Sequence, residues 1–148
     1  MPGQRKTYGA IIAIAAMLIC TLAPTWAAEP VFQGELDPFP FTPATRANVA
    51  GIGTISATLD GNNLTIKGTF SDLPSPATAA HLRMGLAMGV PGAVIGELTV
   101  SHEVAGTFAG KVMLNDTQLA GLRRNALYVQ IDSVKAPDGN LWGWLEIR

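Results

Sequence analysis

The sequence predicts an all-β protein, an antiparallel immunoglobulin-like or Greek-key sandwich of about seven to eight short strands with one short helix. Three observations indicate this class. The 148 residues include 16 glycines and 10 prolines, apolar and polar residues alternate along several segments, and turn signals recur about every ten residues. Strand order is not encoded in periodicity, so the pattern fits a closed barrel as well as a sandwich.

The alternation places the expected strands. Asp60–Asn63 has the composition of a hairpin turn, because Gly and Asn tolerate positive φ, and Pro91–Gly92 and Pro137–Asn140 mark two more turns. In the strand that follows Asp60–Asn63, Leu64 and Ile66 share one side. We expect strands over residues 52–59, 64–70, 80–86, 94–100, 106–114, 127–131 and 141–147.

One helix is predicted over residues 117–124. Asn115 or Asp116 can cap its start, and Leu119 and Leu122 lie on one side. Arg123 and Arg124 fall in its last turn, where cations suit the negative end of the helix dipole.

Residues 1–27 are typical of a signal peptide. Arg5 and Lys6 precede an uninterrupted apolar run over Gly9–Cys20, and Thr25–Ala27 offers small residues before a cut at Ala28. The run is shorter than the roughly 20 residues of a comfortable span, although an uncleaved anchor is the alternative. The chain is therefore expected to be exported, periplasmic or secreted, and its mature form lacks cysteine.

The rest of the chain is expected to form one domain. Residues 28–46 contain four prolines and no clean period, which predicts a covering segment or loop, and the domain itself is expected over 47–148. The formal charge of −1 excludes the basic footprint of a nucleic-acid binder.

Several motifs in the correct order resemble a chordin-type (CHRD) domain. They cover nearly the whole expected mature chain, from about Ala47 to Ile147. Each is weak by itself, and their order carries the resemblance. The motifs are Thr78–Gly85, Gly89–Val94, Gly106–Gly110 before a Leu-rich helix, Leu127–Gln130, and Pro137–Gly143. The resemblance implies a secreted β-sandwich with a role in extracellular binding and no established catalytic activity.

The chain departs from this family pattern at three chemically important positions. Arg83 stands where the second His of a His-x-His pair is typical, Asp132 replaces a His, and Trp142 replaces the closing Arg. The metal site that the family's histidines suggest is therefore not carried over. If Arg83 and Asp132 face each other on neighbouring strands, we expect them to form an ion pair.

A binding face is the functional feature that the alternation favours. When aliphatic residues form the core, the opposite side of three strands carries two Trp, a Tyr and pairable charges, and aromatic residues and Arg are typical interface anchors. Either this face is exposed, or the segment Pro38–Pro43 covers the tryptophans with Phe39 and Phe41. The expected binding residues are His81, Arg83, Tyr128, Gln130, Asp132, Trp142 and Trp144.

The predicted function is therefore a non-enzymatic binding or assembly module that contacts another extracytoplasmic protein or a glycan. A periplasmic copper or zinc protein using His81 and His102, with Glu97, Glu103 or Asp132, is one alternative, although two His and no Cys supply few donors. A carbohydrate-binding module that stacks sugars on its aromatic residues is the other. No cofactor is expected. An enzyme is not expected either, because no nucleophile occurs together with a general base and a residue that would orient that base. Membrane contact is expected only through an uncleaved signal segment.

Overall fold

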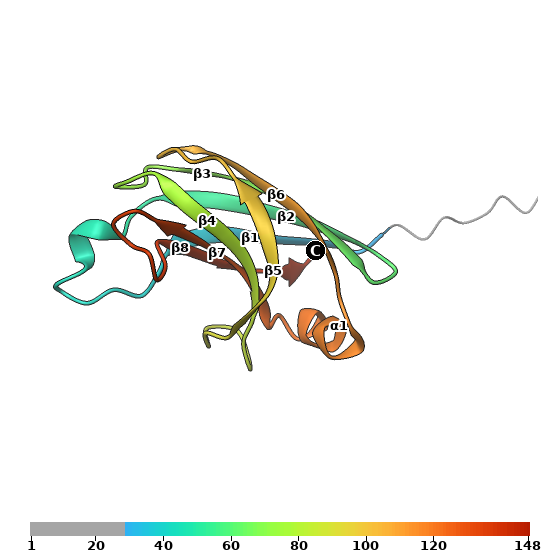
Figure 1. Cartoon of the computed structure of the whole chain (residues 1–148). Coiled ribbons are helices and arrows are strands. Elements are labelled where there is room, and N and C mark those ends of the chain that lie inside the picture. The colour runs from blue at the N-terminus through green and yellow to red at the C-terminus, as the bar shows by residue number, and fades with distance from the viewer. Residues whose placement is uncertain (1–28) are drawn as a thin grey trace, which may run out of the picture.

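The computed structural model describes residues 29–148, and the expected signal peptide lies outside them. Nine strands, one α-helix and one 3₁₀ turn make up this part of the chain (Figure 1). The expected all-β class with one short helix is confirmed. The elements are β1 (Val31–Pro38), η1 (Arg46–Asn48), β2 (Ile52–Asp60), β3 (Asn63–Ser71), β4 (Ala77–Met84), β5 (Ala93–Val100), β6 (Gly106–Met113), α1 (Asp116–Arg123), β7 (Leu127–Ser133), β8 (Leu141–Trp144) and β9 (Glu146–Ile147).

Strand pairing closes the sheet into a barrel of eight antiparallel strands. The order β2-β3-β6-β5-β4-β7-β8-β1 returns to β2, because β1 pairs with β2 along its first part and with β8 at Asp37 and Pro38. The short β9 adds to β1 as an extra strand. The immunoglobulin-like sandwich is not confirmed. Residue alternation reports only which side of a strand is buried, and that side is the same in both architectures.

The barrel is filled by the aliphatic side of the alternating strands. Leu64, Ile66 and Phe70 of β3 point inward as the period predicts. All seven residues of β7 are buried, so this strand is covered on its outer side as well. The largest fully buried side chains are those of Tyr128, Phe32, Phe108, Leu36, Leu64, Ile66, Leu82, Leu114, Leu122, Leu127, Ile131 and Leu141.

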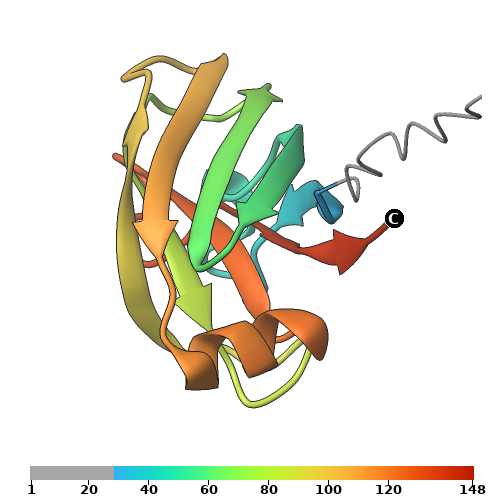
Figure 2. The same cartoon turned by 90° about the vertical axis from the view of Figure 1, so that its right-hand side faces the viewer.

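Helix α1 lies at one end of the barrel (Figures 1 and 2). Asn115 caps it as predicted, since its side chain accepts from the Gln118 backbone and the Gln118 side chain accepts from the Asn115 backbone. Leu119 and Leu122 lie on the buried side of this helix. Among residues 29–148, no helix combines the length and the apolar character needed to cross a membrane.

The expected loop over residues 28–46 is wrong for Val31–Pro38, which form β1 and complete the barrel. Phe32 and Leu36 are buried and the intervening inward position is Gly34, where a side chain would collide with the backbone of Trp144. A glycine at an inward position interrupts the hydrophobic period, which is why the sequence pattern does not reveal this strand. The domain therefore includes β1 rather than beginning at Ala47.

The expected strand over 80–86 ends earlier than its alternation indicates. β4 stops at Met84, and Gly85 begins a turn stabilised by its N–H, which donates to Ala126 O at 2.9 Å. Leu86, which the alternation places on the same side as the buried Leu82, is 85% exposed.

Candidate functional site

The expected binding residues come together on the outer face of β4, β7 and β8, which are neighbours in the sheet. The register places His81 opposite Gln130 and Arg83 opposite Tyr128 across β4 and β7. Across β7 and β8, Tyr128 lies opposite Trp144 and Gln130 opposite Trp142. The core side of the same strands carries Leu82, Val129 and Leu141, so the predicted division of residues between the two faces is confirmed.

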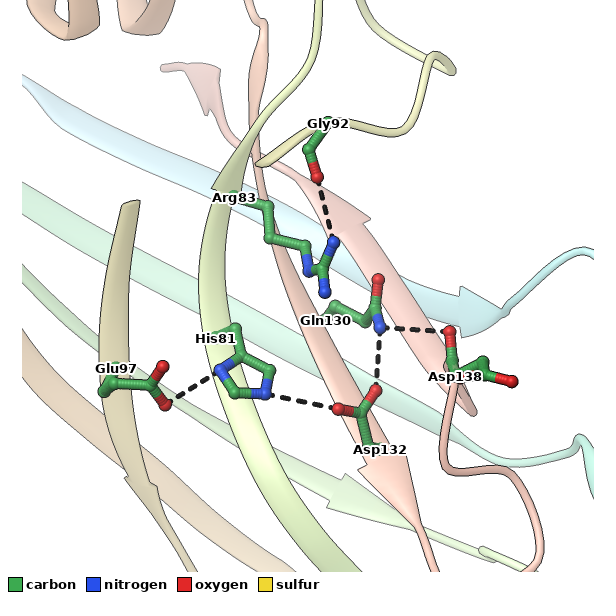
Figure 3. A network of polar contacts seen from close by, with 7 residues as sticks. All are labelled: His81, Arg83, Gly92, Glu97, Gln130, Asp132 and Asp138. Carbon is green, nitrogen blue, oxygen red and sulfur yellow. Dashed lines mark hydrogen bonds and ion pairs between the residues drawn. The ribbon is translucent and has the colours of Figure 1, made fainter. Parts of the chain in front are cut away.

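His81 is the centre of a network of polar contacts (Figure 3). Its Nε2 lies 3.2 Å from Asp132 Oδ2, and its Nδ1 lies 2.8 Å from Glu97 Oε2 on β5. The second contact is close but is not a hydrogen bond, since Nδ1 is buried without a hydrogen-bond partner. When the ring is protonated, both contacts are ion pairs. The His81 side chain is 17% exposed and that of Glu97 is 74% exposed, so the network extends from the interior to solvent.

Asp132 is fixed from a second side by Gln130. The amide Nε2 of Gln130 donates to Asp132 Oδ1 at 2.7 Å and also to the backbone O of Asp138 at 3.2 Å (Figure 3). Gln130 is 2% exposed and Asp132 is 8% exposed. Both carboxylate oxygens therefore have protein partners, as a buried carboxylate requires.

The expected ion pair between Arg83 and Asp132 is wrong. Arg83 Nη1 donates instead to the backbone O of Gly92 at 2.9 Å, and the Arg83 Nε is buried without a partner. Asp132 is satisfied by His81 and Gln130, and among the described residues it shares no hydrogen-bond or ion-pair partner with Arg83. The register explains this outcome, since Arg83 faces Tyr128 on β7, four residues before Asp132.

Tyr128 joins Arg83 in holding Gly92. The Tyr128 hydroxyl accepts from the Gly92 N–H at 2.9 Å and lies 3.4 Å from Gly92 O. Tyr128 is fully buried, although it lies on the outer side of β7. The connection between β4 and β5 therefore folds over this part of the sheet and covers the ring.

Four aromatic rings pack together beside this point. Tyr128 lies 4.4 Å from Trp144 and 5.8 Å from Trp142 between ring centroids, and the two tryptophans are 5.6 Å apart. Phe39 packs edge-on against Trp142 at 5.0 Å. The tryptophans are therefore partly covered and partly exposed, since both are half-buried. Phe39 covers part of Trp142, whereas Phe41 is itself 49% exposed.

The two histidines have separate environments. His102 Nδ1 lies 3.1 Å from the carbonyl O of Ala77, so this nitrogen must carry the proton and donate. His81 contacts Glu97 and Asp132 through opposite sides of its ring. Within residues 29–148, no three His, Cys, Asp or Glu side chains are grouped so that they could hold a metal ion.

Two features of the outer surface were missed by sequence reasoning. One is the role of backbone groups, since Gly92 and Asp138 O fix Arg83, Tyr128 and Gln130 through loops that fold over the sheet. The other is a hollow of about 480 Å³ over the outer face of β1, β2 and β3, whose lining includes none of the aromatic rings. The alternating hydroxyl residues of β2 and β3 were the available signal for this second feature. The hollow is lined by Gln33, Gly34, Glu35, Thr54, Ile55, Ser56, Lys67, Gly68, Thr69 and Arg148.

Comparison with known proteins agrees with the motifs on these strands. A family model, described as the CHRD domain, matches residues 32–145, from the second residue of β1 to the residue between β8 and β9. The resemblance inferred from the motifs is confirmed, and it extends further toward the N-terminus than the motifs indicated. No curated protein and no protein of solved structure shows significant similarity to the chain.

Proposed function

Because the chain belongs to the CHRD domain family, we propose that it is an exported, non-enzymatic module that binds another extracytoplasmic protein through the outer face of β4, β7 and β8. We call this face the aromatic face and define it by His81, Arg83, Tyr128, Gln130, Asp132, Trp142 and Trp144.

The observation that carries the proposal is the fixed, partly exposed tryptophan pair. Trp142 and Trp144 are half-buried, and Tyr128 and Phe39 pack against them. A partner that covers their remaining surface would remove apolar area from water without having to order these rings first. Such pre-ordered aromatic residues are typical anchors of protein interfaces.

The polar residues of the aromatic face support a binding role rather than catalysis. Among residues 29–148, the ion-pair partners of His81 are two carboxylates and no hydroxyl is hydrogen-bonded to its ring, so no hydroxyl nucleophile is paired with this base. Glu97 is the exposed end of this network. A partner with an apolar residue for the tryptophans and a cationic residue for Glu97 would complement the face.

Site-specific photocrosslinking in the producing cell tests the proposal. A benzoylphenylalanine at position 97 should capture a partner protein, whereas the same residue at position 111, an exposed position on β6, should not. Trp144→Ala should abolish the crosslink at position 97, and Met113→Ala, which truncates an exposed side chain on β6, should leave it unchanged. Equal crosslinking at positions 97 and 111, or a crosslink at position 97 that survives both Trp142→Ala and Trp144→Ala, would contradict the proposal.

A further inference from the structure

The connection between β4 and β5 exposes an apolar surface that the aromatic face does not use. No charged residue occurs between Arg83 and Glu97. Within this stretch Leu86 is 85% exposed, and Met88, Val90 and Val94 are each more than 40% exposed. We call Gly85–Val94 the apolar loop. A cluster of exposed aliphatic side chains on a soluble domain is typical of an interaction surface.

The base of the apolar loop is held firmly. The backbone of Gly92 is bound by Arg83 and Tyr128, as described above. Gly85 and Gly92 also lie in close contact with backbone, since an added Cβ would collide with Val90 O at the first position and Met84 O at the second. The tip is therefore presented on a fixed base.

Two exposed arginines lie beside the apolar loop. Figures 1 and 2 both show the loop and α1 at the same end of the barrel, and the Gly85 N–H donates to Ala126 O, just beyond the helix. Arg123 and Arg124 end α1 next to this contact and are both exposed. Among the described residues, neither arginine forms an ion pair.

The surface of the apolar loop at Met88 borders residues of a different charge. A hollow between Met88 and Trp144 is lined by three carboxylate residues and one arginine, which are Glu35, Asp37, Glu146 and Arg148. The cations that complement an anionic surface are therefore those at the end of α1, and the carboxylates next to Met88 are expected to stay in water.

We propose that the apolar loop, together with Arg123 and Arg124, is a membrane-contact surface that inserts shallowly into an anionic lipid bilayer. Exposed aliphatic side chains enter the boundary between headgroups and acyl chains, and arginines beside them bind the lipid phosphates. The shape supports a bilayer as the occupant, because a protruding tip needs no complementary pocket. Self-association through the loop about a twofold axis is disfavoured, since it would bring the arginines of two copies together.

A local probe tests this proposal in the full chain. In a Cys20→Ser background, Leu86→Cys provides the only cysteine for an environment-sensitive nitrobenzoxadiazole label. With vesicles of phosphatidylcholine and phosphatidylglycerol, its emission should shift to the blue and be quenched by doxyl-labelled acyl chains. Val134→Cys, 62% exposed on the loop after β7, is the matched control and should show neither effect. Because the readout is at residue 86, binding through the N-terminal segment does not by itself produce it.

The role of the arginines is tested by measuring the lipid concentration that gives half of the blue shift of the label at position 86. Arg123→Gln and Arg124→Gln should each raise it about fivefold, and exposed Lys135→Gln, on the loop after β7, should not change it. With the label moved to Met88→Cys, Leu86→Ser should raise the concentration about tenfold or more. A label at position 86 that stays in water when these vesicles are added would overturn the proposal. So would a blue shift that needs protein concentration but no lipid, since that result would assign the loop to a second copy.

Discussion

Nε2 of His81 on β4 lies 3.2 Å from Oδ2 of Asp132 on β7. This contact occupies the carboxylate that the sequence assigned to Arg83. Gln130 completes the arrangement by donating to the other oxygen of Asp132 at 2.7 Å. A histidine and an amide therefore satisfy the carboxylate, and Arg83 is free to hold the backbone of Gly92.

A double-mutant cycle should detect this pairing. For His81→Gln and Asp132→Asn, we expect a coupling free energy of about 0.5–3 kcal/mol in urea unfolding, because the two side chains are in contact. The matched cycle of Arg83→Gln and Asp132→Asn should give less than about 0.5 kcal/mol, since these residues share no partner. A larger coupling for Arg83 than for His81 would show that the assigned pairing is incorrect.

Tyr128→Phe should loosen the apolar loop. The buried hydroxyl accepts from the Gly92 N–H at 2.9 Å, and its removal leaves that donor unpaired. We expect a loss of about 1–3 kcal/mol in the free energy of unfolding and faster amide exchange at Gly92. Thr54→Val, which removes one hydroxyl of an exposed Thr54–Thr69 pair, is the control and should change stability little. Unchanged exchange at Gly92 in Tyr128→Phe would argue against the contact.

Truncation of two leucines four residues apart should change the free energy of unfolding by very different amounts. Leu82 is fully buried, so Leu82→Ala should destabilise the fold by about 2–5 kcal/mol. Leu86 is 85% exposed, so Leu86→Ala should change stability by no more than about 0.5 kcal/mol. Urea unfolding of both variants measures the difference. Similar losses at the two positions would mean that β4 continues through Leu86.

Phe39→Ala should expose one tryptophan and not the other. Phe39 packs on Trp142 at 5.0 Å, whereas Trp144 packs on Tyr128. In a Trp26→Phe background, with Trp144→Phe or Trp142→Phe to isolate each signal, both tryptophans should begin with intermediate acrylamide quenching. Phe39→Ala should then increase the quenching of Trp142 alone and reduce stability by about 0.5–1.5 kcal/mol beyond the lost area. An equal increase for Trp144 would indicate general loosening of the fold.

Much of the site could be predicted because alternation along β4, β7 and β8 fixes which side chains share a face. His81, Tyr128 and Trp142 were placed correctly on the outer side. Their burial could not be predicted in the same way. Tyr128 is buried by Trp144 and by the backbone around Gly92, which are 16 and 36 residues away in the chain. Local spacing carries no information about such contacts.

The sequence by itself determined the positions of most strands, the side of each that faces the core, the hairpin at Asp60–Asn63 and the Asn115 cap. These features depend on residues a few positions apart, whose spacing sets their relative direction. Only the tertiary structure decided that β1 closes a barrel, that His81 rather than Arg83 pairs with Asp132, and that Leu86 projects into solvent. Each of these depends on which distant segments become neighbours, and that choice is made by packing of the whole chain rather than by any local period.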